Sequence, residues 1–310
     1  MRSVNFAFLG SQEIVKELGK KGTTSDLAIF DRKESDFIYT WTAPISYPDK
    51  IQSLLQALNM CEYVIIHVTK LDKFLGEQVI AINSLGIKSG IIFISYEVDE
   101  DKLKFLIKGT SLESFVLVND IESLKRELHL IEPKTNSGPL LLPIDHAFEV
   151  KGVGTVALGI IKQGKLSVHD EFQLYPQNKK IVVKSIQMHD DSVLDSESPS
   201  RVGVALKGIH ADEISRGDII ASPGYLMNTT DDDVKVTFEK NSYFNEEISE
   251  TQTYYISIGL QIKPVKIKIG NNIEIIPEKS IVFHSDQKFV ILKLDSSKNR
   301  IVGSGFFTKL

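Results

Sequence analysis

The spacing of hydrophobic positions changes part-way along the chain. Up to about residue 130, short apolar runs at residues 4–9, 63–68, 90–95 and 115–118 alternate with segments of helical periodicity. Apolar residues recur at helical spacing through residues 51–58, and a second helical pattern over 74–85 stops at Gly86, where a left-handed cap is expected. Strands that alternate with helices are typical of a parallel sheet wrapped by helices. We therefore predict an α/β domain over residues 1–131.

Breaker residues separate this domain from a second kind of pattern. Residues 132–139 are polar and contain two prolines and a glycine, so we predict a linker there. From residue 140 onward, short β-type runs follow one another with Gly, Asn and Asp between them. A further breaker cluster at residues 222–233 divides this β series. We predict two small β-barrels, at residues 140–224 and 231–310.

Composition and charge limit the kinds of partner. The 310 residues are 42% hydrophobic and 25% charged, which matches a folded chain of more than one domain. The formal net charge of −5 excludes a broadly cationic surface, so we expect no DNA partner and only local contacts with RNA. Six lysines either supply phosphate contacts or form solvated strand faces: Lys179, Lys180, Lys184, Lys263, Lys266 and Lys268.

Few residues are suited to metal or covalent chemistry. The single cysteine, Cys61, can form neither an internal disulfide nor a thiolate metal site, which is typical of a reducing cytoplasm. The seven histidines lack zinc-ligand spacing, and no nucleophile motif occurs. The apolar runs fall far short of the ~20 residues that a membrane span requires. We expect a cytoplasmic protein with no metal, no cofactor, no catalytic residue and no membrane segment.

The most specific segment lies in the first predicted barrel. Residues 143–156 read Pro-Ile-Asp-His-Ala-Phe-Glu-Val-Lys-Gly-Val-Gly-Thr-Val, 184–189 read Lys-Ser-Ile-Gln-Met-His, and 214–218 read Ile-Ser-Arg-Gly-Asp. Gly152 and Gly154 on either side of Val153 permit a tight turn or bulge. These strings closely resemble the second domain of EF-Tu-type translation factors, and most of all the SelB branch. Residues 300–306 are similar to the closing strand of the third domain of the same family.

The resemblance implies a nucleic-acid partner. In this family the surface of the second domain accepts the 3′ end of an aminoacylated tRNA. The partners implied are therefore aminoacyl-tRNA or the ribosome. Carried over to the matching positions, the resemblance points to these residues as partner contacts: Lys151, Val153, Thr155, Gln187, Met188 and His189.

The N-terminal half resembles the GTPase domain of a shortened archaeal SelB-like group, but it departs from the phosphate-binding motif. That motif, G-x-x-x-x-G-K-[ST], wraps the phosphates in backbone amides and supplies a lysine and a Mg²⁺ ligand. After the first strand the chain reads Gly10-Ser11-Gln12-Glu13, without a second glycine or a following Lys-Ser/Thr. Residues 19–23, Gly-Lys-Lys-Gly-Thr, have similar letters at the wrong spacing, and we interpret them as a helix end with a solvated turn.

Two further nucleotide-binding elements of the family are also altered. After the strand at 37–41 the family has the motif D-x-P-G-H. At the corresponding positions, Ala43 stands in place of the Mg²⁺-linked aspartate, Ser46 in place of the glycine, and Tyr47 in place of the histidine. Val98 occupies the aspartate position of the guanine-reading N-K-x-D, although the adjacent Asp99 could preserve one contact. These departures at Gly10, Ala43, Ser46, Tyr47 and Val98 place GTP binding in doubt.

The leading hypothesis is a translation elongation factor-like binding protein with a degenerate P-loop-GTPase-like α/β domain followed by two EF-Tu-type β-barrels. Its N-terminal domain is a scaffold, and its β-domains contact tRNA or a ribosome-associated partner without a nucleotide. Two alternatives stay open: a functional GTPase with an atypical nucleotide site, and a structural subunit of a protein complex. The sequence therefore favours a binding protein over an enzyme.

Overall fold

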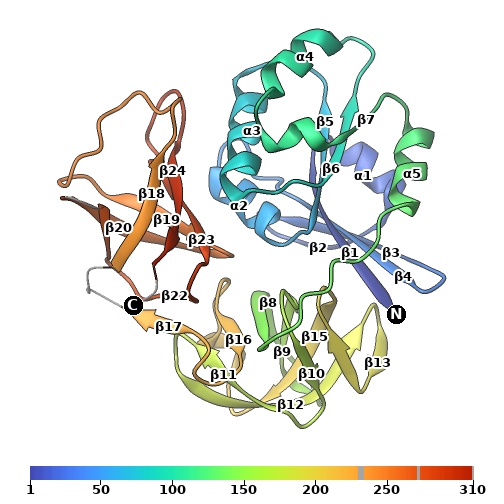
Figure 1. The fold of residues 1–310 in the computed structure, drawn as a ribbon. Helices are drawn as coiled ribbons and strands as arrows, with labels where there is room; N and C mark the ends of the chain where they lie inside the picture. The colour runs from blue at the N-terminus through green and yellow to red at the C-terminus, as the bar shows by residue number, and fades with distance from the viewer. Residues whose placement is uncertain (230–233, 271–272, 309–310) are drawn as a thin grey trace. The chain divides into compact units, whose positions relative to one another are not determined.

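The computed structural model describes residues 1–229, 234–270 and 273–308, and the chain divides into two compact units (Figure 1). The first unit comprises Met1–Pro133 together with Asp295–Ile301, and the second comprises Lys134–Leu294 with Val302–Leu310. The short stretch Asp295–Ile301 thus belongs to the N-terminal unit although it lies near the end of the sequence. The boundaries inferred from the sequence, at residues 131, 140, 224 and 231, stay a prediction.

The first unit is built on a mixed sheet in the order β2-β3-β4-β1-β5-β6-β7. Its parallel strands are β4 (Phe37–Ala43), β1 (Arg2–Leu9), β5 (Tyr63–Val68), β6 (Gly90–Ile94) and β7 (Val116–Val118). After Arg2, every residue of β1 is buried, as expected for a strand covered on both faces. Antiparallel β3 (Ala28–Glu34) and β2 (Lys20–Thr24) extend the sheet beyond β4.

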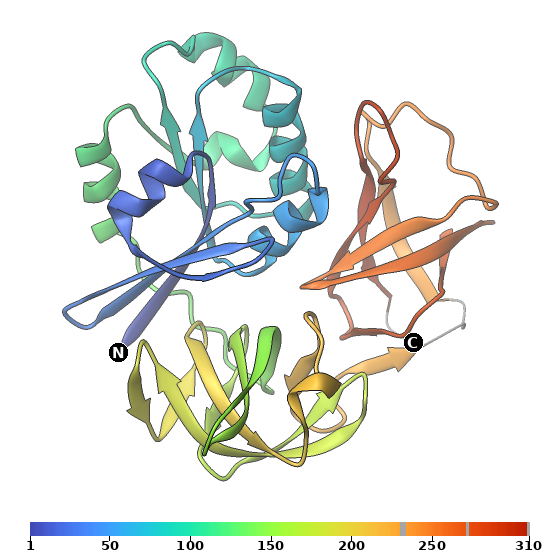
Figure 2. The same cartoon turned by 180° about the vertical axis from the view of Figure 1, so that it is seen from behind.

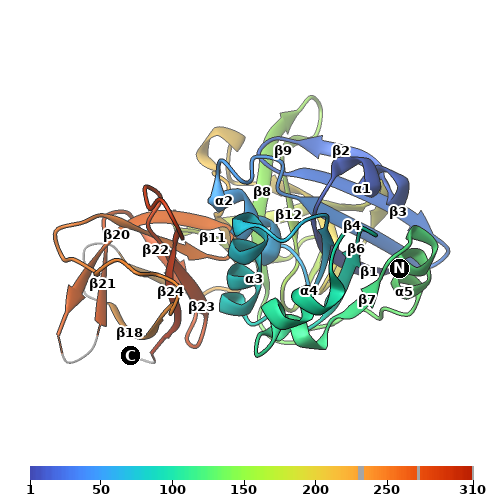
Figure 3. The ribbon, with the colours of Figure 1, turned by 90° about the horizontal axis from the view of Figure 1, so that it is seen from above.

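Helices cover both faces of this sheet (Figure 2). One face carries α1 (Gln12–Leu18) and α5 (Ile121–His129), and the other carries α2 (Ile51–Asn59) and α3 (Lys73–Leu85), which lie side by side (Figure 3). The α3 helix ends at Gly86 with φ 69°, the left-handed cap that the sequence predicts. The remaining helices are α4 (Glu100–Ile107) and the 3₁₀ turn η1 (Ser111–Ser114).

Residues 20–23 differ from the sequence prediction. The helix α1 does end before Gly19, as expected, but the solvated turn predicted after it is wrong, because these residues form β2. Lys20 and Lys21 pair with Asp31 and Phe30 of β3. A largely polar strand has no apolar period to reveal it, so only the neighbouring strand decides its conformation.

The second unit begins with a barrel whose sheet order is β11-β16-β8-β9-β15-β12-β13, closed by pairing of β11 with β12. Its strands are β8 (Leu141–Val150), β9 (Gly154–Ile160), β11 (Glu171–Tyr175), β12 (Lys179–Met188), β13 (Asp191–Val193), β15 (Arg201–Lys207) and β16 (Ile219–Ala221). The short pair β10 (Lys165–Ser167) and β14 (Asp195–Glu197) and the 3₁₀ turn η2 (Ala211–Glu213) flank it.

A second closed barrel follows, in the order β18-β21-β20-β19-β23-β24. Its strands are β18 (Val234–Lys240), β19 (Tyr254–Ile258), β20 (Gln261–Ile269), β21 (Ile273–Pro277), β23 (Lys288–Leu292) and β24 (Ile301–Phe307). Strands β17 (Met227–Thr229) and β22 (Ile281–Phe283) form a separate two-stranded sheet. An α/β domain followed by two β-barrels is therefore the architecture, which confirms the predicted fold class.

Candidate functional site

A cavity of about 580 Å³ lies in the first unit at the carboxyl ends of β1, β4 and β5. Because β1 runs between β4 and β5, the sheet changes its direction of winding here, and ligands of open α/β sheets bind at such points. Of the residues at altered GTPase positions, Gly10, Ala43 and Tyr47 line this cavity. Ser46 and Val98 are not part of its lining.

The connection from β1 to α1 leaves no room for a phosphate-wrapping loop. Only Gly10 and Ser11 lie between the two elements, and the Ser11 hydroxyl caps α1 by accepting from the Glu13 amide at 3.2 Å. A side chain at Gly10 would meet the Cβ of His67 at 2.6 Å, so this glycine serves close packing. The Glu13 carboxylate in the first turn of α1 suits the helix dipole and pairs with the Lys16 ammonium at 2.7 Å.

The residues after β4 are held by the protein itself. Ala43 is buried at the end of the strand and carries no oxygen for a metal ion. The Ser46 hydroxyl donates to the Asp26 carboxylate at 2.9 Å, and the Tyr47 hydroxyl donates to the carbonyl of Phe74 at 2.9 Å. Burial and the nearby Glu77 carboxylate raise the pKa of Tyr47 far above its usual value. Tyr47 is therefore neutral and its hydroxyl is already hydrogen-bonded, so it does not act as a base.

His67 lines the cavity near the end of β5. Its ring stacks on Phe93 with centroids 4.8 Å apart, and its Nε2 lies 3.1 Å from the Ser95 hydroxyl. Burial lowers the pKa of His67, so the imidazole is neutral near pH 7. Sequence reasoning did not identify this residue, because a lone histidine in an apolar strand resembles an ordinary core position.

The loop after β6 offers no base-reading carboxylate at Val98, whose amide donates to the Ser95 carbonyl at 3.0 Å. The neighbouring Asp99 caps α4 by accepting from the Lys102 amide at 3.1 Å and pairs with the Lys102 ammonium at 3.0 Å. The hydrogen bond with Lys102 lowers the pKa of this carboxyl. The carboxylate that could have preserved one guanine contact is thus used as a helix cap.

The first barrel of the second unit carries the other candidate surface. Lys151 and Val153 are exposed in the tight turn between β8 and β9, where Gly152 and Gly154 have φ of 82° and 97°. Thr155 is buried, with its hydroxyl 2.7 Å from the Glu149 carboxylate and 2.8 Å from the Ile209 carbonyl. Thr155 therefore supports the turn from inside.

The matching segment of β12 lies two strands away, since β15 runs between β9 and β12. Gln187 is exposed, whereas Met188 is buried and accepts from the Ser196 hydroxyl through its sulfur at 3.3 Å. His189 and Asp190, with φ of 46° and 69°, form the turn to β13 and expose His189. Gly203 of β15 pairs with both Leu158 and Gln187, which places the two segments on one sheet.

Comparison with known proteins gives matches along the whole chain. A sequence model of the elongation factor Tu domain 2 family matches residues 154–221. The selenocysteine-specific elongation factor of Methanocaldococcus jannaschii is 27% identical over 85% of this chain and 61% of its own length. "Uncharacterized protein MJ0325" of the same organism is 34% identical over 98% of this chain and 99% of its own length. The chain is an EF-Tu/SelB-like elongation factor paralogue.

Solved structures show the same fold. SelB from Methanococcus maripaludis, in complex with the GTP analogue GPPNHP, superposes with a TM-score of 0.83 at 21% identity, covering 100% of this chain and 79% of SelB. A bacterial selenocysteine-specific elongation factor, EF-Sec, gives a TM-score of 0.80 at 20% identity, over 99% of this chain and 58% of EF-Sec. The predicted fold is therefore confirmed.

Most of the candidate phosphate-binding lysines of this SelB-like chain already have acceptors. Lys180 pairs with Glu171 at 2.6 Å, Lys268 pairs with Glu274 at 3.1 Å, and Lys179 pairs with Glu213. The ammonium of Lys184 donates to the Val153 carbonyl. These contacts favour strand faces neutralised within the protein over a continuous phosphate-binding surface.

Other kinds of site are not seen in the part of the chain that the structure describes. Across residues 1–229, 234–270 and 273–308, no group of three or more His, Cys, Asp or Glu side chains is placed to hold a metal ion. In the same ranges, no helix has the length and apolar character needed to span a membrane.

Proposed function

We propose that this EF-Tu/SelB paralogue is a cytoplasmic binding factor that contacts tRNA, or a ribosome-associated partner, without a bound nucleotide. The observation that carries the proposal is the direct connection of β1 to α1 through Gly10 and Ser11. A phosphate site of this family needs a loop of backbone amides at that position. Without it, the N-terminal domain is a scaffold and GTP hydrolysis is not the activity.

The partner side of the proposal is supported by the relatives and by the exposed residues of the first barrel. The M. jannaschii relative is named a selenocysteine-specific elongation factor, and the match to EF-Tu domain 2 covers β9 to β16. Lys151, Val153, Gln187 and His189 are exposed on this barrel. Thr155 and Met188 support these residues from the barrel interior.

The proposal predicts that affinity for tRNA does not depend on nucleotide. Binding measured with GTP, with GDP and with neither, all in Mg²⁺, should give equal dissociation constants, because a ligand shifts affinity only when it binds two states unequally. A contact dominated by phosphate should weaken log-linearly with added salt in every case. A tenfold difference between nucleotides, about 1.4 kcal/mol, would contradict the proposal and favour the GTPase alternative.

A second prediction concerns the barrel surface. The double variant Gln187→Ala and His189→Ala should weaken tRNA binding by about tenfold, because polar contacts at a nucleic-acid interface contribute roughly 1–3 kcal/mol together. Lys279→Ala, at an exposed position of the other barrel, is the control and should leave affinity unchanged. Equal affinities for the two variants would show that tRNA does not contact Gln187 and His189. If the wild-type protein binds no RNA, the structural-subunit alternative is favoured.

A further inference from the structure

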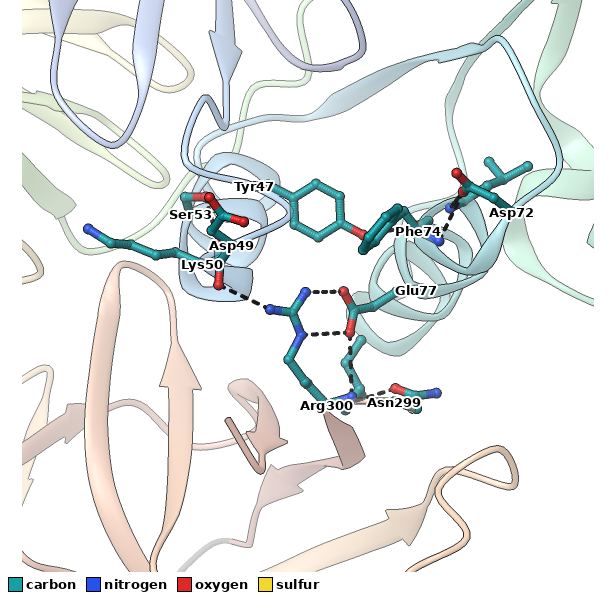
Figure 4. Close-up of polar contacts among 11 residues, drawn as sticks. Tyr47, Asp49, Lys50, Ser53, Asp72, Phe74, Glu77, Asn299 and Arg300 are labelled. Atoms are coloured by element: carbon teal, nitrogen blue, oxygen red, sulfur yellow. Dashed lines mark hydrogen bonds and ion pairs between the residues drawn. The ribbon is translucent and has the colours of Figure 1, made fainter. Parts of the chain in front are cut away.

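A buried ion pair joins the segment Asp295–Ile301 to α3 inside the first unit (Figure 4). The guanidinium of Arg300 donates from Nη2 to Glu77 Oε2 at 2.5 Å and from Nε to Glu77 Oε1 at 3.0 Å. Arg300 also donates from Nη1 to the backbone carbonyl of Asp49 at 3.3 Å. The side chains of Arg300 and Glu77 are only 15% and 7% exposed.

The side chains of Arg300 and Glu77 lie next to residues that line the cavity. Tyr47 and Phe74 both line the cavity. The Tyr47 hydroxyl donates a hydrogen bond to the Phe74 carbonyl, and the two rings meet edge-on with their centroids 6.3 Å apart. The Arg300 guanidinium carbon lies 6.0 Å from the centroid of the Tyr47 ring. Arg300 therefore contacts α3 through Glu77 and the 44–50 loop through Asp49 and Tyr47, as Figure 4 shows.

The chemistry of the pair makes its geometry specific. A planar guanidinium that meets a carboxylate with two parallel hydrogen bonds fixes orientation as well as distance. The hydrogen bond with Glu77 raises the pKa of Arg300, so the arginine stays charged. Asn299, also buried, accepts from the Ile301 amide at 2.9 Å and holds the backbone beside Arg300. Loss of either charge would leave the other buried without compensation.

The 44–50 loop has little structure of its own. It contains turns but neither helix nor strand, and its backbone bonds include Tyr47 to Pro44 at 3.1 Å and Lys50 to Ser46 at 2.7 Å. Segments of this kind open at low free energy unless other parts of the protein hold them. The contacts from Arg300 act on this loop from outside its own sequence.

We propose that the Glu77–Arg300 ion pair is a built-in clamp that holds the 44–50 loop and the start of α3 in one arrangement without any bound ligand. Arg300 supplies this restraint through its contacts with Glu77 and Asp49, and the loop is ordered at all times. The inference rests on the proposed function in one respect, namely that no nucleotide orders this loop.

Hydrogen exchange on the full-length protein, without nucleotide or RNA, tests the clamp. Arg300→Met and Glu77→Gln should each speed exchange of the amides of residues 44–50 and the first turn of α3 by about tenfold or more. Because both variants remove the same interaction, the double variant should exchange no faster than the faster single variant. Lys298→Met removes an exposed cation from the same segment and should match the wild-type protein.

The outcomes separate the clamp from the proposed function. Exchange within twofold of wild type in Arg300→Met, or strictly additive effects in the double variant, would overturn the clamp. If circular dichroism shows that Arg300→Met is unfolded, Arg300→Lys is measured instead. This variant keeps the positive charge but cannot form the two parallel hydrogen bonds of the guanidinium. Its amides should exchange faster only in the 44–50 loop and the first turn of α3. Slower exchange of the Arg300→Met loop on adding GTP and Mg²⁺ would leave the clamp standing and refute the absence of a nucleotide site.

Discussion

Calorimetric titration of the purified protein with GTP or GDP in Mg²⁺ is expected to show no binding in the micromolar range. A micromolar dissociation constant corresponds to about −8 kcal/mol. The chain has no phosphate-loop motif after β1, and Ala43 and Val98 stand where the resembled family has a metal ligand and a base-reading carboxylate. Each charge-assisted contact contributes roughly 1.5–3 kcal/mol. Loss of several such contacts removes the whole of that binding free energy.

Glu13→Gln separates charge from geometry in this experiment. The variant removes the carboxylate at the start of α1 but leaves the short β1–α1 connection unchanged. It should still fail to bind, because no backbone loop surrounds the phosphates. Micromolar affinity in Glu13→Gln alone would show that repulsion, not the missing loop, excludes the nucleotide; micromolar affinity in the wild-type protein would refute the prediction.

Arg201→Met is expected to destabilise the first barrel by about 3–5 kcal/mol, because it leaves the Asp145 carboxylate buried without its cation. The Arg201 guanidinium donates from Nη2 to Asp145 Oδ1 at 3.2 Å and from Nη1 to Asp145 Oδ2. His146 Nδ1 lies 2.8 Å from Oδ1, and the Asp145 side chain is fully buried. Hydrogen exchange of the slowest amides in β8, β9 and β15 measures the change within this barrel.

The matched control is Lys180→Met, which breaks the exposed ion pair with Glu171 in the same barrel and should cost less than ~1 kcal/mol. Burial alone would raise the pKa of Asp145, but Arg201 and His146 hold it below its usual value. A carboxyl with a lowered folded-state pKa stabilises the fold above its unfolded pKa of about 3.9, and this stabilisation is lost as pH falls through the folded pKa. Arg201→Met with the stability of Lys180→Met would contradict the prediction.

The sequence determined the order of the domains and showed that no phosphate-loop motif follows the first strand. The change from mixed strand and helix patterns to short β runs predicted an α/β domain followed by two barrels, because these periodicities follow from local backbone geometry. The cap at Gly86 and the turn at Gly152 and Gly154 need left-handed backbone, which glycine adopts without strain. The phosphate loop is contiguous in sequence, so its absence at residues 10–13 is visible without a structure.

Only the tertiary structure decided which side chains of the candidate surface are exposed and which hold the protein together. Met188 and Thr155 belong to partner-contact strings in the sequence, yet the barrel closes around both. Residues 20–23 became a strand because β3 pairs with them. Glu77 and Arg300 are 223 positions apart, and neither position shows a local signal of its partner. Such contacts depend on the distance between elements in the folded chain, which short-range patterns of hydrophobic and polar residues do not encode.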